Sequence, residues 1–214
     1  MYSRGMGNHQ NDGTAIGTPP SSTQERLVTS ARELLWERGY VGTSPKAILQ
    51  HAGVGQGSMY HHFAGKSDLA LAAIRRTAED MRTATDEILS APGTAYDRVA
   101  AYLLREREVL RGCPIGRMTQ DRDVVQDPAL RAPLDAMFDW LRRRIAEVLA
   151  EGQRRGELAA GLDPAATAAS VAAVVQGGYV LARAAEDPAP FDAAVHGLLA
   201  LLATHATPPP PVAP

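Results

Sequence analysis

Residues 44–63 of the chain, SPKAILQHAGVGQGSMYHHF, decide the fold. Ser44 is a favourable N-cap and Pro45 a favourable first residue, which predicts the start of a short helix. The glycines of Gly53-Val54-Gly55 interrupt that helix, and a second short helix is expected from about Gln56 to His62. Two short helices joined by a glycine turn are typical of a helix-turn-helix unit.

Longer helical patterns flank this unit on both sides. A capping box of Ser22 and Glu25 precedes an apolar stripe that ends at Gly39, and a long helix is expected from near Lys66 to beyond Ile88. Further helices are expected at 96–110, around 118–125, from 130 to beyond 149, at 164–185 and at 191–203. Because the alternation typical of strands is almost absent, we expect an all-α protein.

The composition divides the chain into two folded parts and two tails. Residues 1–20 and 207–214 offer little apolar surface to bury, so we expect both tails to be disordered. Residues 21–81 are expected to form a three-helix, helix-turn-helix domain with its motif at about 44–63, and residues 82–206 a second helical domain.

Charge and cysteine content narrow the class of protein. The net charge is -2, but residues 23–76 hold seven Lys or Arg against four Asp or Glu, a basic balance that fits contact with DNA. The single cysteine, Cys113, cannot form an internal disulfide, which favours the cytoplasm. We expect no membrane partner, because residues 1–20 contain no signal peptide and the richest apolar stretch, 165–175, is too short to cross a bilayer.

The outer face of the second short helix carries groups suited to reading DNA. A helix enters the major groove, which is about 12 Å wide, and reads base edges through side-chain hydrogen bonds. Gln56 can bond bidentately to adenine and Ser58 to either purine, while hydroxyls, helix N-termini and lysines can contact phosphates. The predicted DNA-contacting residues are Thr43, Ser44, Lys46, Gln56, Gly57, Ser58, Tyr60, His61 and Lys66.

Other interpretations of this segment have less support. Its glycines do not match GxGxxG and no strand precedes them, which argues against a nucleotide site. His61 and His62 diverge on a helix without a Cys or acidic partner at ligand spacing, so we expect neither a metal site nor a cofactor. Tyr60 fits either a phosphate contact or an anchor on the core side with its hydroxyl outward.

The runs GYVGTS at 39–44, AGVGQGSMYHHF at 52–63 and KSDL at 66–69 resemble the TetR family of repressors. The resemblance extends in register over residues 22–75. It departs from the usual pattern at Gly55, where Ser often caps the recognition helix, and at 45–49, which lacks the common acidic residue. The resemblance implies a homodimer that binds pseudo-palindromic operator DNA.

The body of the chain resembles the LmrA/YxaF-like branch of the same family. The similar features are GCPIG at 112–116, the Phe138-x-Trp140 helix, GEL at 156–158 and QGG at 176–178. They imply repression relieved by a ligand, and dimerisation through the last two helices.

Apolar faces of the body helices, together with a few polar groups, predict a pocket for a small hydrophobic effector. The predicted lining residues are Tyr102, Leu103, Met118, Met137, Phe138, Leu141, Gln176 and Tyr179. Met118, Met137 and Phe138 fit an ordinary core equally well. The long helix that begins near Lys66 can reach this pocket near Met81 or Ile88, and so connect it to the DNA-binding domain.

Small residues on the next-to-last helix and an apolar stripe on the last helix predict a two-fold interface. The predicted interface residues are Ala168, Ala172, Val175, Gly178, Phe191, Val195, Leu198 and Leu202. We therefore expect a transcriptional regulator that acts as a ligand-released repressor and is not an enzyme, since the sequence shows no nucleophile-base-acid constellation. The alternatives are a helical enzyme and a structural protein without a role at DNA.

Overall fold

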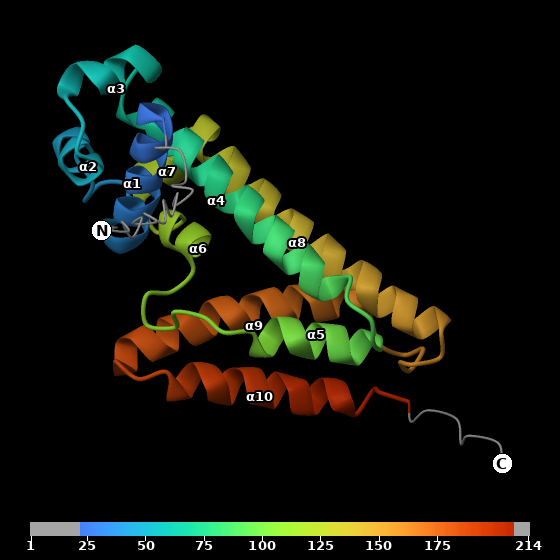
Figure 1. Ribbon diagram of the computed structural model, residues 1–214. Coiled ribbons are helices and arrows are strands. Elements are labelled where there is room, and N and C mark those ends of the chain that lie inside the picture. The colour runs from blue at the N-terminus through green and yellow to red at the C-terminus, as the bar shows by residue number, and fades with distance from the viewer. Residues whose placement is uncertain (1–21, 208–214) are drawn as a thin grey trace, which may run out of the picture.

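The computed structural model describes residues 22–207, and within that range it is built from helices (Figure 1). In chain order they are α1 (Thr23–Arg38), α2 (Pro45–Ala52), α3 (Gln56–His62), α4 (Lys66–Leu89), α5 (Ala95–Leu104), α6 (Pro114–Met118), α7 (Arg122–Gln126), α8 (Pro128–Arg154), α9 (Pro164–Ala185) and α10 (Ala189–Ala203). Among these residues one isolated bridge joins Leu158 and Ala206, and no named strand is present, so the all-α prediction is confirmed.

The predicted tails and the predicted domain boundary can both be compared with the structure. The predicted tails, 1–20 and 207–214, lie outside the described residues except for Thr207, whose amide donates a hydrogen bond to the Glu157 carbonyl. The boundary expected between residues 81 and 82 falls inside α4, which is one continuous helix. A single helix therefore belongs to both parts of the chain.

The first three helices form a small head whose local signals act as expected. The Ser22 hydroxyl accepts a hydrogen bond from the Glu25 amide, and the Ser44 hydroxyl accepts one from the Ala47 amide, each at 3.1 Å. These caps begin α1 and α2 because the first amides of a helix have no partner within it. Helix α2 ends at Gly53, whose φ of 62° lies in the left-handed region that glycine tolerates best.

The body consists of two long helices that leave the head together and a layer formed by α5, α9 and α10 (Figure 1). Helices α4 and α8 run side by side in the same direction, joined near the head by Ser67 and Asp127 and further along by the Arg144–Asp86 ion pair at 2.6 Å. At the far end, buried Arg98 of α5 donates to the Leu89 carbonyl and pairs with Glu151. These contacts fix α5 against both long helices.

Two helices end differently from the sequence expectation. The helix expected at 96–110 stops at Leu104. There the guanidinium of Arg107 donates hydrogen bonds to the carbonyls of Tyr102 and Leu103. Those carbonyls would otherwise accept hydrogen bonds from a following helical turn. The single helix expected around 118–125 is instead the pair α6 and α7, separated by a turn at residues 119–121.

Helix α9 is longer than the 165–175 stretch considered above. Its 22 residues, Pro164–Ala185, make it long and apolar enough, by length and composition alone, to cross a membrane. In the structure it packs against α8 and α10, and part of its surface remains exposed. The apolar character of α9 therefore serves the packing of the body and also leaves an apolar outer face.

The residues predicted to form a two-fold interface point inward. Ala168, Ala172, Val175, Gly178, Phe191, Val195, Leu198 and Leu202 are all buried within the protomer. A Cβ added at Gly178 would lie 2.8 Å from the Phe191 ring, so the small residue allows α10 to approach α9 closely. The prediction that this stripe meets a second copy was therefore wrong, because the two helices of one protomer already bury it.

Gly152 in α8 provides a test of this packing. Gly152→Ala adds helix propensity of about 1 kcal/mol. The added methyl group would, however, collide with the Cβ of Ala95 and lie 3.0 Å from Leu158, and such overpacking costs about 1–3 kcal/mol. We expect a net decrease in the free energy of unfolding, measured by urea denaturation at fixed protein concentration. The matched control is Gly57→Ala in α3, where no atom lies within 4 Å of the new Cβ, and which should be neutral or stabilising by up to about 1 kcal/mol.

Candidate DNA-binding face and ligand cavity

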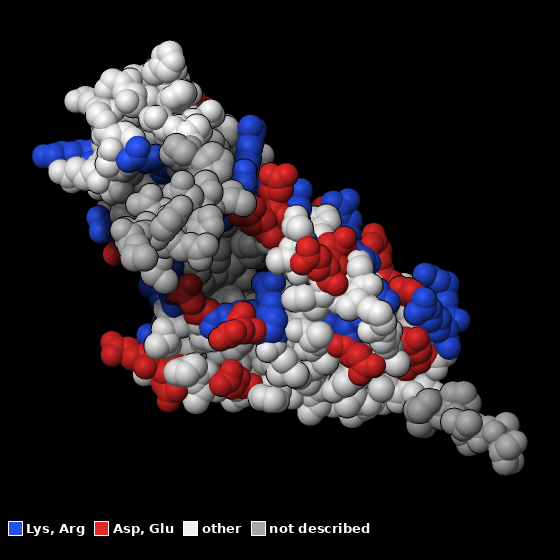
Figure 2. All heavy atoms as spheres, in the orientation of Figure 1, with Lys and Arg blue, Asp and Glu red and all other residues white. Residues whose placement is uncertain are grey.

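Helix α3 presents an uncharged polar face at the end of the head. Met59 alone is buried among its seven residues, and it anchors the helix to the head core. Gln56, Gly57 and His61 are exposed, and Ser58 is half-buried. Tyr60 is 57% exposed, so its side chain lies on the outer face and not in the core. Figure 2 shows few charges over this end of the molecule, with Lys or Arg side chains at its edge.

The flanking residues divide into two groups. Ser44 and Lys46 are exposed at the start of α2, beside the groove between α2 and α3 that Gln56 and Tyr60 also line. Thr43 is instead fully buried, and its hydroxyl donates within the head to the carbonyls of Leu34 and Gly39. The expectation that the Thr43 hydroxyl contacts phosphate is therefore wrong, because the turn after α1 uses it.

Lys66 points toward the junction between head and body. Its ammonium lies 4.1 Å from the centre of the Tyr40 ring, a cation–π distance. Burial lowers the pKa of Lys66, and the nearby carboxylates of Asp121 and Asp123 partly oppose that decrease. This orientation gives Lys66 an intramolecular partner in place of the expected phosphate.

A cavity of about 560 Å³ lies between the head and the body. Six of the eight predicted residues line it, namely Tyr102, Met137, Phe138, Leu141, Gln176 and Tyr179. The other two predicted residues, Leu103 and Met118, are buried in the core and do not line this cavity. Residues not predicted for it also contribute, including Trp36, Arg105, Arg107, Ile115 and Val175.

Helix α1 of the head forms one wall of this cavity through Trp36. The indole N–H of Trp36 donates to the Gly112 carbonyl at 3.0 Å, and the Arg111 guanidinium stacks 3.7 Å above the ring. Arg111 in turn binds the carboxylate of Glu33 on α1 at 2.5 Å. The N-terminal helix is thereby tied to the loop that borders the cavity.

A second tie joins the two parts at the turn after α1. The Asp121 carboxylate accepts hydrogen bonds from the backbone amides of Tyr40, at 2.7 Å, and Val41, at 3.4 Å. Asp121 follows α6, whose residues Pro114 and Ile115 line the cavity. A displacement of α6 therefore reaches the base of the helix-turn-helix through a few direct contacts.

The polar side of the cavity holds phenols that stay neutral near pH 7. Burial raises the pKa of Tyr102, and the guanidinium groups of Arg105 and Arg107 partly oppose the increase. Burial raises the pKa of Tyr179 to about 12. Cys113, also in the lining, is buried, and its Sγ accepts a hydrogen bond from the Gly116 amide. Among residues 22–207 no group of three or more His, Cys, Asp or Glu side chains could hold a metal ion.

A head of short helices joined by a glycine turn, with the second of them exposed and with a tie to a helical body that borders a cavity, is the arrangement of a helix-turn-helix regulator. Residues 27–73 match the model of bacterial regulatory proteins of the tetR family, and residues 94–198 match the tetracyclin repressor-like C-terminal domain. The chain belongs to the TetR family of transcriptional regulators. It is a DNA-binding regulator and not an enzyme.

Individual relatives support this assignment. The transcriptional regulator AcuR of Cereibacter sphaeroides is 30% identical over 164 residues, 73% of this chain and 74% of that protein. LmrA of Bacillus subtilis is 25% identical over 79% of this chain and 90% of its own length, as expected from the resemblance of the body. A solved TetR regulator from Chloroflexus aurantiacus is 30% identical with a TM-score of 0.78, covering 86% of this chain and 96% of that chain.

A further solved relative shows the fold together with DNA. The TetR regulator CifR was solved as a mutant in complex with a 26 bp double-strand operator. It is 24% identical with a TM-score of 0.72, and the match covers 87% of this chain and all of CifR. At this identity the likeness concerns the fold, so the DNA contacts of the present chain have to be argued from its own residues.

Proposed function

We propose that this protein is a cytoplasmic homodimer that binds a pseudo-palindromic operator and is released from it by a small apolar molecule in the cavity. Residues 21–81 would bind DNA, and residues 82–206 would bind the effector and the second copy. The observation that carries this proposal is the position of Trp36. It belongs to the helix that supports α2 and α3, and it also lines the cavity.

The exposed face of α3 supports the DNA-binding part of the proposal. Gln56 and Ser58 lie at the start of the helix, which is where a recognition helix contacts base edges. Tyr60 and His61 project from the following turn, and Lys46 and the N-terminus of α2 lie beside them. Contacts to bases select the sequence, and contacts to phosphates position the protein on the DNA. We assign the first role to Gln56 and the second to Lys46.

The outer surface of α9 and α10 supports dimerisation through residues other than those predicted. Val180, Leu181 and Leu201 are 57%, 55% and 67% exposed on these two adjacent helices. Small exposed residues accompany them, namely Ala173, Gly177 and Ala184 on α9 and Ala193, Gly197 and Ala200 on α10. A second copy packed here would cover this apolar surface, and the small residues would allow close approach of the helices.

Two routes connect the cavity with the head. Met81, Ala84 and Ile88 of α4 line the cavity, and the same helix begins at the head. The second route runs through Trp36 and Asp121 to the turn after α1. A ligand that favours one arrangement of these elements, while DNA favours the other, would couple the two sites with about 1–3 kcal/mol.

DNA-contact variants test the roles assigned to the head. Gln56→Ala should reduce discrimination at one base pair of each half-site by about 1–3 kcal/mol. Lys46→Ala should instead weaken binding to all sequences similarly and reduce the slope of log affinity against log salt by about one unit. Fluorescence anisotropy with operator fragments at several salt concentrations measures both effects. A change of base preference in the Lys46 variant, with none in the Gln56 variant, would show the assignment to be wrong.

Dimerisation is tested by placing charge on the exposed apolar face. The double variant Val180→Glu, Leu201→Glu should fold, since both side chains are exposed in the protomer, but should sediment as a monomer and lose operator affinity. The control is Val125→Glu on α7, which lies beside the head and should leave the dimer intact. A wild-type protein that sediments as a monomer at micromolar concentration would contradict the proposal.

Release is tested by linkage. A compound that binds the cavity should lower the affinity of the protein for operator by about 5- to 150-fold. Operator should lower the affinity of the protein for the compound by the same factor. Asp121→Ala should reduce this factor, because it removes the acceptor for the Tyr40 and Val41 amides, whereas Asp135→Ala on the exposed side of α8 should not. If operator left the affinity of every cavity-binding compound unchanged, ligand-controlled release would be excluded.

A further inference from the structure

The segment after α5 places its positive side chains toward the cavity and its negative side chains toward solvent. Residues 105–108 read Arg-Glu-Arg-Glu, so their formal charges cancel in the sequence. In the structure Arg105 and Arg107 are half-buried, whereas Glu106 and Glu108 are exposed. Side chains alternate between two sides of a non-helical, extended segment. The two guanidinium groups are therefore turned inward and the two carboxylates outward, although all four residues border the cavity.

The two inward arginines meet at the ring of Tyr102. Their guanidinium carbons lie 5.1 Å and 5.3 Å from its centre, so two like charges share one buried aromatic surface. Arg105 donates to the Thr85 hydroxyl, and Arg107 donates to backbone carbonyls, while the Nε of Arg107 is buried without a hydrogen-bond partner in the described residues. Neither arginine forms an ion pair with any carboxylate of residues 22–207, so no protein carboxylate neutralises their charge at close range.

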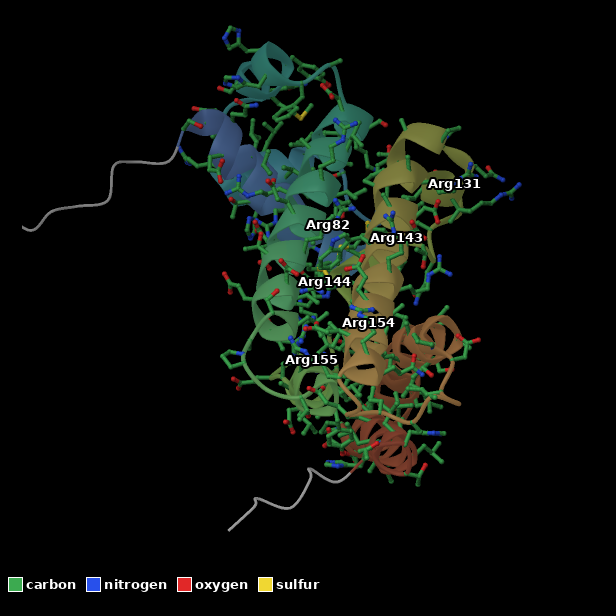
Figure 3. All side chains as sticks on the ribbon, turned by 90° about the vertical axis from the view of Figure 1, so that its right-hand side faces the viewer. Arg82, Arg131, Arg143, Arg144, Arg154 and Arg155 are labelled. Carbon is green, nitrogen blue, oxygen red and sulfur yellow. The ribbon has the colours of Figure 1, made fainter. Side chains whose placement is uncertain are left out.

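Three arginines in and just after α8 differ in this respect. Figure 3 labels Arg143 and Arg144 of α8 and Arg155, which directly follows that helix. Arg143 pairs with Asp139 at 3.2 Å, Arg144 with Asp86 at 2.6 Å, and Arg155 with Glu151. These three arginines thus have carboxylate partners, whereas Arg82, Arg131 and Arg154, also labelled in Figure 3, form no ion pair within residues 22–207.

The remaining lining supplies neutral donors and an apolar wall. Tyr102 and Tyr179 are phenols that ordinarily keep their protons at neutral pH, and burial raises the pKa of both further. A phenol O–H can donate to an anion but adds no negative charge that would repel it. Apolar contact is provided by Met81, Ile88, Met137, Phe138 and Leu141.

We infer that the cavity binds an organic anion, with an apolar body about the size of two rings and a carboxylate or sulfonate group that pairs with the Arg105 guanidinium and is attracted by the charge of Arg107. Guanidinium groups bind such oxyanions through paired N–H donors. A volume of about 560 Å³ accommodates a molecule of this size. The effector role of this anion rests on the proposed function, whereas its binding does not depend on DNA.

Arg105 is the appropriate residue to change. Arg107 also holds the carbonyls of Tyr102, Leu103 and Arg105, so its loss would disturb the end of α5. Arg105 has one side-chain hydrogen bond, of 3.3 Å, to Thr85. Methionine in its place keeps an unbranched apolar stem and removes the charge, while lysine keeps the charge.

The probes are 8-anilinonaphthalene-1-sulfonate and N-phenyl-1-naphthylamine, fluorescent molecules with the same rings that differ by one sulfonate. We expect the wild-type protein to bind the sulfonate at least about tenfold more tightly than the amine, as one charge-assisted hydrogen bond can provide. Arg105→Met should abolish this preference and leave the affinity for the amine unchanged, whereas Arg105→Lys should retain most of it. Ala84→Trp, which fills the cavity from α4, should lower the affinity for both probes. Arg143→Met should leave the affinity for both unchanged.

The outcomes separate this inference from the proposed function. Equal affinity of the wild-type protein for the two probes would overturn the inference. An equal loss of affinity for both probes in Arg105→Met would do the same, as would sulfonate binding that Ala84→Trp does not weaken. If Arg105→Met does not fold, the wild-type preference and the Arg105→Lys variant decide the question. Addition of operator DNA to the sulfonate complex is a separate measurement. An unchanged sulfonate affinity there would count against release while leaving the class of ligand supported.

Discussion

The hydrogen bond from the Trp36 indole to the Gly112 carbonyl is the contact on which the relation between head and body depends. Gly112 has a φ of 83°, a conformation that favours glycine, and its carbonyl is the acceptor at 3.0 Å. Arg111 covers the other side of the contact by stacking on the ring and binding Glu33. With the indole fixed in this way, the shape of the cavity is linked to the position of α1, and therefore to the helices that α1 supports.

The parts of the fold that could be predicted from sequence are those that short segments determine. Ser44, Pro45 and Gly53 start and stop α2 through groups within a few residues of one another, so their effect is visible in the sequence. Most of the lining of the cavity could also be predicted, because the apolar faces of several body helices meet there with Tyr102, Gln176 and Tyr179. The family resemblance contributed the expectation of a DNA-binding head, which the match over residues 27–73 confirms.

The features that could not be predicted depend on contacts between distant segments. A small-residue stripe on α9 is compatible with a neighbour in the same protomer or in a second copy, and the sequence alone does not distinguish Phe191 from a partner. In the sequence the Thr43 hydroxyl is a suitable phosphate donor, whereas in the fold it donates to the carbonyls of Leu34 and Gly39, which no local pattern reveals. The alternation at 105–108 was present in the sequence, but it was assigned to a helix, in which it would not have separated the charges.

The shallow attachment of α3 has a consequence for how such a regulator changes over time. One side chain of the helix, Met59, is buried in the head, and the N-cap position is Gly55, which supplies no side-chain hydrogen bond. Most positions of the helix therefore contribute little to the stability of the head, and substitutions there have a small cost in folding. With α3 in its proposed role as the helix that reads the operator, mutation can change the preferred operator while the core, the cavity and the tie to the body stay intact, so that new regulatory targets are accessible by single steps.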